Sequence, residues 1–280
     1  MIAYIGTGLL GSGFIQALLS KGETVQVWNR SFEKAKALEQ FGATAHANIA
    51  DAVKGCKRIH LTLTDDAVVD AVLESAWPAL EPGAILIDHS TTSVQGAMDR
   101  AAKWKKRGYS YIHAPVFMGP ANALQGTGTM LVSGDQETIR LLEPALSKMT
   151  AKLWNLGENA GKAAAIKLVG NLFHLCFTAG IADMVALSNA LGIETSELGP
   201  LFEVLNPGGI AQARLKKIQS NTFDVASWEL SMARKDAGLM MSETSQKNKS
   251  LTVIPAVAQK MDALIEKGLG KHDWTVLTRE

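Results

Sequence analysis

Short apolar runs recur through the first half of the chain, and each is followed by a polar or glycine-rich stretch. Runs with the length of buried strands lie at residues 1–5, 24–28, 43–45, 58–63, 84–88, 110–114, 129–133 and 152–155. Apolar residues at helical spacing fill most of the intervals, as at residues 94–107 and 136–149. Strands that alternate with helices predict an α/β domain with a doubly wound, mostly parallel sheet.

The strand pattern stops after Gly157, and the rest of the chain is patterned as helices. A single long helix is expected over residues 161–190, and shorter helices over residues 194–205, 211–220, 228–245 and 253–267. We therefore expect an α/β domain at residues 1–157 and an all-helical domain at residues 158–280. The long helix forms the entrance to the helical domain, which we expect to serve substrate binding and oligomerisation.

The long helix is apolar almost all round between residues 163 and 181, which predicts a buried helix. Its exceptions, Lys167, Asn171, His174 and Thr178, are spaced to share one face. A buried lysine is usually paired or placed for use, because burying an unpaired charge is costly. Two alternatives remain, namely that this face meets solvent or that the Lys167 ammonium reaches out of the core.

Residues 6–11 read Gly-Thr-Gly-Leu-Leu-Gly, directly after the first strand and at the start of a helix. This setting is typical of the dinucleotide-binding turn of a Rossmann-type domain. Gly6 permits the tight turn, Gly8 lets the backbone approach a pyrophosphate, and Gly11 lets the helix pack on the strand. The free N–H groups at the helix start favour an anion there. The residues expected to bind cofactor are Gly6, Thr7, Gly8, Leu9, Leu10 and Gly11; a purely structural glycine turn is the alternative.

The second strand ends in Asn29, Arg30 and Ser31, where an NAD-preferring site usually carries an acidic residue. A guanidinium suits the 2′-phosphate of NADP(H) instead, so we expect these three residues to bind that cofactor. Ser31 is also a candidate N-cap for a helix that runs to about residue 40. A solvated surface role is the alternative for Arg30.

Composition and motifs limit the partners, the metal or disulfide sites and the acid/base residues to be expected. A net charge of +1 over 280 residues argues against nucleic acid as the partner. The spacing of the six histidines and of Cys56 and Cys176 predicts neither a metal site nor a disulfide framework. Strand-like residues from Ile2 and the lack of an uninterrupted run of 18 apolar residues predict a cytoplasmic protein without a membrane partner. No Tyr-x-x-x-Lys pair occurs, which leaves Lys167 as the acid/base candidate.

Five segments together carry a resemblance to a known family: Gly6-Thr-Gly-Leu-Leu-Gly11, Asp88-His-Ser-Thr-Thr92, Ala114-Pro-Val116, residues 161–171 and Lys235-Asp236. On these segments nearly the whole chain resembles the β-hydroxyacid dehydrogenases, which have a 6-phosphogluconate dehydrogenase-like NAD-binding domain. The family includes 3-hydroxyisobutyrate dehydrogenases and glyoxylate/succinic semialdehyde reductases.

The resemblance assigns roles to particular residues. It implies that Lys167 is the catalytic acid/base and that Asn171 is its partner on the substrate side. It also implies that Thr91 and Lys235 lie near the nicotinamide, and that Leu63 and Thr64 lie against the cofactor. Because the family is usually dimeric or tetrameric, we expect a homodimer or homotetramer.

The chain departs from the family pattern where the substrate is expected. The usual Ser-Gly-Gly after Ala-Pro-Val is replaced by Phe117-Met118-Gly119, an aspartate by His113, and an asparagine by Gly170. The lost hydroxyl predicts a weaker hold on a carboxylate, although the N–H groups of Met118 and Gly119 are expected to remain available. A Phe117 side chain turned into the core is the alternative. The residues expected around the substrate are Phe117, Met118, Gly119, Asn171 and His174.

These observations predict an NADP(H)-dependent oxidoreductase that moves a hydride between the nicotinamide and a small aldehyde, keto acid or β-hydroxyacid. Two other functions stay open. An imine reductase has the same architecture but typically replaces the lysine, so Lys167 counts against it and the altered carboxylate motif counts for it. A non-catalytic NADP-binding protein could lose Lys167 freely, so the presence of Lys167 in a polar face argues against that function.

Overall fold

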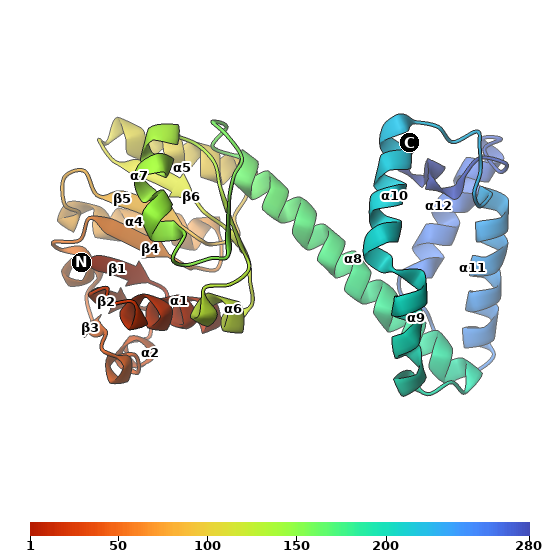
Figure 1. The fold of residues 1–280 in the computed structure, drawn as a ribbon, viewed down its shortest axis with the longest axis horizontal. Helices are drawn as coiled ribbons and strands as arrows, with labels where there is room; N and C mark the ends of the chain where they lie inside the picture. The colour runs from red at the N-terminus through yellow and green to blue at the C-terminus, as the bar shows by residue number, and fades with distance from the viewer. The chain divides into compact units, whose positions relative to one another are not determined.

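The computed structural model describes residues 1–280, which form two compact units, Met1–Asn171 and Leu172–Glu280. The first unit contains every strand, and the second contains only helices and the end of a helix that it shares with the first (Figure 1). The units divide inside that shared helix. The domain boundary at residue 157 stays a prediction.

Six parallel strands form the main sheet of the first unit, in the order β3-β2-β1-β4-β5-β6. They are β1 (Ile2–Ile5), β2 (Val25–Trp28), β3 (Thr44–His46), β4 (Arg58–Leu61), β5 (Ile85–Asp88) and β6 (Ser110–His113). The chain proceeds from β1 to β3 on one side and from β4 to β6 on the other, so β1 borders the point where strand order reverses. Ligands of open α/β sheets bind at the strand C-termini beside such a point. This topology confirms the predicted Rossmann-type sheet.

Helices cover both faces of this sheet (Figure 1). They are α1 (Leu9–Ser20), α2 (Phe32–Lys36), α3 (Ile49–Val53), α4 (Asp66–Ala76), α5 (Val94–Lys106) and α7 (Gln136–Leu146). Alternate residues of β1 point to opposite faces, so Ile2 and Tyr4 join one apolar core while Ala3 and Ile5 join the other. Burial on both faces explains why β1 reads as a continuous apolar run rather than as an alternating one.

A second, three-stranded sheet follows, and the sequence pattern did not predict it as separate. It consists of β7 (Val116–Phe117), β8 (Thr129–Val132) and β9 (Lys152–Asn155), with β7 antiparallel to β8 and β8 parallel to β9. The short helix α6 (Pro120–Gln125) also lacks a periodic signal because it has only six residues. It packs on α1, where a side chain at Gly13 would come within 2.8 Å of the Pro120 carbonyl oxygen.

Helix α8 (Lys162–Leu191) leads into the second unit. That unit contains α9 (Gly199–Leu205), α10 (Pro207–Ser220), α11 (Leu230–Ser245), α12 (Ile254–Glu266) and 3-10 turns at Thr195–Leu198 and Trp274–Thr278. Its core contains Phe223, Leu230 and Met261. From α8, the Asp183 carboxylate accepts the N–H groups of residues 252, 253 and 254, which start α12. The all-helical second half is thus confirmed.

The prediction that α8 is buried is wrong for the single chain. Between residues 172 and 178 its side chains are exposed, with Leu172 at 63% and Leu175 at 71%. An apolar composition indicates that a helix surface is buried, but it does not indicate whether the same chain or another molecule buries it. α8 is also the one helix long and apolar enough to cross a membrane, a test that core helices of soluble proteins pass as well.

Candidate active site

The glycine turn between β1 and α1 has the shape that a dinucleotide requires. Gly6 has a φ of +94°, and a Cβ there would lie 2.2 Å from the Thr62 carbonyl oxygen. A Cβ at Gly11 would lie 2.2 Å from the Gly6 carbonyl oxygen. A Cβ at Gly8 would meet nothing within 4 Å. Two glycines are therefore required by packing, and the middle one borders open space.

The start of α1 leaves polar groups for a ligand. Gly8 occupies the N-cap position, so no side chain caps the first free N–H groups of the helix. The Thr7 hydroxyl is buried and has no hydrogen-bond partner in the chain. Unpaired N–H groups at a helix start favour an anion, and a buried hydroxyl needs a partner. This turn therefore fits the pyrophosphate of a dinucleotide.

The end of β2 is tied to the glycine turn through Asn29. The Thr7 N–H donates to Asn29 Oδ1 at 3.2 Å, and Asn29 Nδ2 donates to the Ser31 carbonyl at 3.0 Å. Arg30 and Ser31 are exposed beside it. Ser31 makes no side-chain cap, and α2 ends at Lys36 before a 3-10 turn at Glu39–Phe41, so the predicted capped helix to residue 40 is wrong.

The ends of β4 and β5 meet at the same edge of the sheet. The Leu63 N–H donates to Ser90 Oγ at 2.8 Å, which joins the two loops. Thr64 and Thr91 are exposed on these loops. The first unit therefore brings together the predicted cofactor residues that follow β1, β2, β4 and β5.

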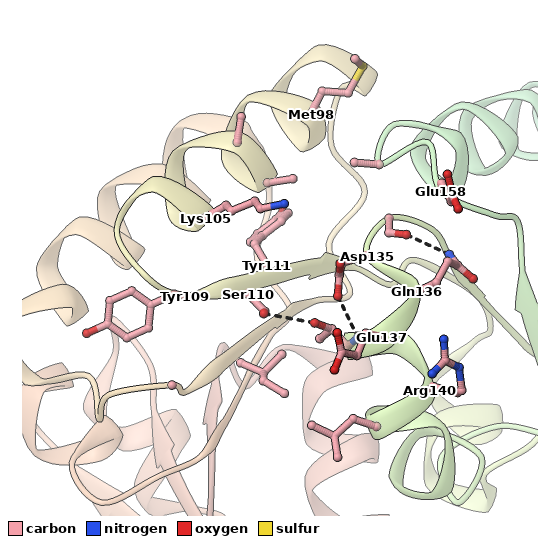
Figure 2. A pocket seen from close by; sticks show the side chains of 18 residues that line it. Met98, Lys105, Tyr109, Ser110, Tyr111, Asp135, Gln136, Glu137, Arg140 and Glu158 are labelled. Carbon is pink, nitrogen blue, oxygen red and sulfur yellow. Dashed lines mark hydrogen bonds between the residues drawn. The ribbon is translucent and has the colours of Figure 1, made fainter.

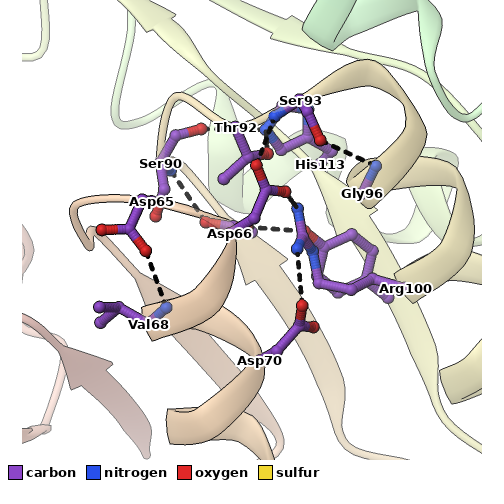
Figure 3. A network of polar contacts seen from close by, with 12 residues as sticks. Asp65, Asp66, Val68, Asp70, Ser90, Thr92, Ser93, Gly96, Arg100 and His113 are labelled. Carbon is purple, nitrogen blue, oxygen red and sulfur yellow. Dashed lines mark hydrogen bonds and ion pairs between the residues drawn. The ribbon is translucent and has the colours of Figure 1, made fainter.

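A buried polar network that the sequence analysis missed supports the Ser90 loop (Figure 3). Arg100, only 1% exposed, pairs with Asp66 at 2.7 Å and donates through Nε to the Tyr111 hydroxyl at 3.0 Å. Tyr111 donates to Asp88 Oδ2 at 2.6 Å, while Asp88 Oδ1 accepts the Ser90 N–H at 2.9 Å. No local motif signals Arg100, because its direct partners lie on α4 and β6, far from it in the sequence.

Three buried histidines continue this network. His60 Nδ1 lies 3.0 Å from His89 Nε2, and His89 Nδ1 lies 2.8 Å from the Ala114 carbonyl oxygen. His113, which replaces the family aspartate, places Nε2 2.9 Å from the Ser90 carbonyl and 3.2 Å from Thr92 Oγ1. Burial lowers the pKa of His89 to about 4 and lowers the pKa values of His60 and His113 as well. The lowered pKa values favour the neutral form of all three rings at pH 7.

The acid/base candidate lies at the end of the first unit. Lys167 is half-buried on α8, and this burial lowers the pKa of its ammonium. Its Nζ lies 4.5 Å from the centroid of the Phe117 ring. Asn171, one helical turn further, is also half-buried. Because Phe117 is partly exposed and contacts Lys167, the alternative of a ring buried wholly in the core does not hold.

One expectation about the substrate loop is wrong. The Gly119 N–H donates to Asn122 Oδ1 at 2.9 Å, and Asn122 is held in turn by Thr127. The N–H of Gly119 is therefore already used by the first turn of α6, and only that of Met118 is left from the expected pair.

The remaining two predicted residues, His174 and Lys235, lie in the second unit. Lys235 is exposed, and its Nζ pairs with Asp236 at 3.0 Å. The first unit thus contains Lys167, Asn171 and Phe117 but neither of these two residues.

A cavity of about 1090 Å³ lies elsewhere, between α5 and α7 along β6 (Figure 2). Its lining includes Met98, Lys105, Tyr111, Gln136 and Arg140, with charges of both signs. It contains none of the predicted site residues. The candidate site is therefore defined by the strand ends and α8, and not by cavity size.

Comparison with known proteins agrees with this geometry. Residues 1–157 match the NAD binding domain of 6-phosphogluconate dehydrogenase. The chain is 26% identical to the 3-sulfolactaldehyde reductase of Escherichia coli, over 100% of this chain and 95% of that protein. It is 24% identical to the 2-(hydroxymethyl)glutarate dehydrogenase of Eubacterium barkeri, over 99% of this chain and 93% of that protein.

Among solved structures, an imine reductase from Myxococcus stipitatus in complex with NADP⁺ superposes with a TM-score of 0.92 at 23% identity, over 100% of this chain and 99% of that one. At this identity the likeness concerns the fold. Together with the strand order, the glycine turn and the family match over residues 1–157, it leads to one conclusion. The chain belongs to the β-hydroxyacid dehydrogenase family and carries the NAD-binding domain of the 6-phosphogluconate dehydrogenase type.

Proposed function

We propose that the chain is an NADP(H)-dependent oxidoreductase that interconverts a small carbonyl compound and its hydroxyl product, with Lys167 as the general acid/base. One observation carries the proposal. In a chain with an NAD-binding domain, Lys167 is half-buried, and no carboxylate lies within 4.0 Å of its Nζ to form an ion pair. A desolvated, unpaired lysine is suited to exchange a proton.

The residues of the glycine turn and of the β2 end bind the cofactor in this proposal. The α1 N–H groups and the Thr7 hydroxyl hold the pyrophosphate, and the open side of Gly8 admits it. Arg30 is exposed at the place where a 2′-phosphate needs a cation. When bound, NADP(H) supplies or accepts the hydride.

Lys167 handles the proton. In the reductive direction its ammonium holds the substrate oxygen, stabilises the negative charge that develops there and donates a proton to it. The Asn171 amide, one turn along α8, orients the same oxygen. In the oxidative direction, neutral Lys167 removes the hydroxyl proton. The lowered pKa of Lys167 brings both protonation states closer to neutral pH.

The substrate loop, residues 117–119, favours substrates other than small carboxylic acids. Phe117 and Met118 supply apolar surface where a serine hydroxyl is usual, and the Gly119 N–H is used by Asn122. We therefore propose a preference for aldehydes or semialdehydes with an apolar or extended body over acids of glyoxylate size. Two relatives are named for anionic substrates, 3-sulfolactaldehyde and 2-(hydroxymethyl)glutarate. The proposed preference therefore rests on the loop of this chain and not on its relatives.

An imine reductase is the second candidate. The loop lacks the usual serine hydroxyl, and the Gly119 N–H is used by Asn122; a cyclic imine needs neither of these carboxylate-binding groups. The Myxococcus neighbour is also named for this activity. Lys167 counts against it because the related imine reductases typically replace that lysine.

A substrate panel tests the choice. NADPH oxidation is followed across aldehydes of increasing chain length, each with and without a terminal carboxylate, alongside 2-keto acids and cyclic imines. We expect the highest kcat/KM for an extended aldehyde or semialdehyde. A clear preference for glyoxylate would contradict the loop argument, and turnover of imines alone would favour the second candidate. Tight NADPH binding with no turnover of any compound would favour a non-catalytic protein.

The exposed apolar surface of α8 supports self-association. Val169, Leu172 and Leu175 are all more than 60% exposed in the single chain. Because Lys167, Asn171 and His174 interrupt the helix with polar groups, we propose that a second copy covers α8 in a cytoplasmic homodimer or homotetramer. Light scattering during size-exclusion chromatography without detergent tests this, and a monomer would contradict it.

A further inference from the structure

Gly170 and Phe117 fit each other closely. A Cβ built on Gly170 would lie 2.3 Å from Cζ and 2.6 Å from Cε1 of the Phe117 ring. The ring therefore rests on the bare backbone of α8 at this glycine. Gly170 has no positive φ that would require a glycine, and a glycine inside a helix disfavours the helix relative to alanine. Packing against the ring is the structural reason for a glycine here.

The same ring also meets the lysine. Lys167 precedes Gly170 by three residues, so both lie on one face of α8. Lys167 Nζ is 4.5 Å from the centroid of the Phe117 ring, within the range of a cation–π interaction. A ring that rests on Gly170 thus carries the ammonium of Lys167 on its face.

The backbone of Phe117 is well held. Phe117 ends β7 and pairs with Thr129 of β8. Gly128, directly before β8, packs closely against the Phe117 backbone, because a Cβ built on it would lie 2.9 Å from the Phe117 carbonyl oxygen. The ring is consequently fixed by a strand on one side and by a helix on the other.

We propose that Phe117 is a positioning residue for Lys167: its ring, resting on Gly170, holds the ammonium by a cation–π interaction and so fixes the proton donor in place. This inference rests on the proposed function of Lys167. It explains the two departures from the family pattern together, since the phenylalanine in place of serine needs the glycine in place of asparagine.

The electrostatics follow from the same geometry. Burial lowers the pKa of Lys167, and no charged group contributes to that shift. β7 brings no titratable side chain to the lysine, and the neighbouring titratable residues along α8 are Lys162 and His174. The face of an aromatic ring favours the charged form of an amine, so the ring opposes the effect of burial.

Phe117→Leu tests the ring, because leucine keeps an apolar side chain but has no aromatic face. We expect a lower pKa of Lys167, an alkaline limb of the kcat–pH profile that moves to lower pH, and a kcat at pH 8 reduced about 2- to 30-fold. Phe117→Tyr restores a ring and should restore the profile. Phe41→Leu makes the same change on an exposed 3-10 turn and should leave the pKa of Lys167, the alkaline limb and kcat unchanged.

Gly170→Ala tests the packing of the Phe117 ring against the α8 backbone. Its methyl group displaces the ring, so we expect the same change in the profile as for Phe117→Leu. The double variant Phe117→Leu/Gly170→Ala should resemble Phe117→Leu alone, because the ring that the methyl group displaces is already gone. Additive effects of the two changes would overturn the pairing.

The pKa of Lys167 is measured without turnover from the ¹³Cε shift of protein labelled at lysine Cε, with the signal assigned by its loss in Lys167→Arg. An unchanged titration in folded Phe117→Leu would overturn the positioning role even if Lys167→Ala is inactive. Full activity of Lys167→Ala would overturn the proposed function instead, and this inference with it. The two failures are therefore seen in different variants.

Discussion

Gly8→Ala should abolish tight NADPH binding without unfolding the protein. The φ and ψ of Gly8, −67° and −177°, suit alanine, and the new Cβ would meet no protein atom within 4 Å. The methyl group would instead fill the side of the turn from which a pyrophosphate approaches. The change thus separates the role of glycine in admitting a ligand from its role in folding, since it blocks the ligand while leaving the fold intact.

This substitution should change the free energy of NADPH binding much more than the free energy of unfolding. Alanine is a poorer N-cap than glycine by about 0.5–1 kcal/mol, and it restricts the unfolded chain by about 0.4–1 kcal/mol, so the two effects nearly cancel. Loss of one charge-assisted hydrogen bond to the pyrophosphate costs about 1.5–3 kcal/mol, which corresponds to a roughly 10- to 100-fold higher Kd.

Two matched variants sharpen the test. Gly11→Ala places a Cβ 2.2 Å from the Gly6 carbonyl oxygen and should lower the free energy of unfolding by about 1–3 kcal/mol. Gly208→Ala, in the first turn of α10, meets nothing within 4 Å and should lower neither NADPH affinity nor the free energy of unfolding. Calorimetric titration with NADPH and urea unfolding measure the two quantities.

Two outcomes would contradict the role assigned to Gly8. If Gly8→Ala binds NADPH as tightly as the parent, the open side of the turn is not the cofactor path. If Gly8→Ala unfolds like Gly11→Ala, then the middle glycine is structural and the assignment of the turn rests on packing alone.

Two further predictions concern specificity and pH. The parent should bind NADP(H) more tightly than NAD(H), and Arg30→Ala should reduce that preference by about 10- to 100-fold in calorimetric titrations. Equal affinities of the parent for the two cofactors would refute the role of Arg30. His60, His89 and His113 have folded-state pKa values below the unfolded value of about 6.5, so the unfolded chain binds protons first as pH falls. Their contribution to the free energy of unfolding is complete above about pH 6.5 and is lost as pH falls through the folded-state pKa values, which is about 4 for His89. Equal urea midpoints at pH 7.5 and pH 5 would contradict this.

Local pattern predicted the features that depend on local chemistry. Strand–glycine–helix order was enough to identify the turn, because a positive φ and close packing demand glycine at Gly6 and close packing demands it at Gly11. The spacing of Lys167 and Asn171 likewise placed both on one helix. These signals lie within a few residues of one another, so no tertiary information is needed to find them.

Other features depend on segments far apart in the chain. Arg100 meets Asp66, Tyr111 and, through Tyr111, Asp88, and nothing near position 100 marks it as buried. The pairing of Asn122 with the Gly119 N–H arises in a six-residue helix too short for a periodic signal. Exposure of α8 could not be predicted either, because composition does not say whether one chain or two provide the cover.

The central claim is that Lys167 exchanges the proton while the glycine turn binds the cofactor. With the best substrate of the panel, kcat and the NADPH Kd are measured for Lys167→Ala and for Lys162→Ala, an exposed lysine at the start of the same helix. We predict that Lys167→Ala lowers kcat by about 10²- to 10⁴-fold with an NADPH Kd close to that of the parent, and that Lys162→Ala changes neither. A kcat for Lys167→Ala within a few-fold of the parent would contradict the account.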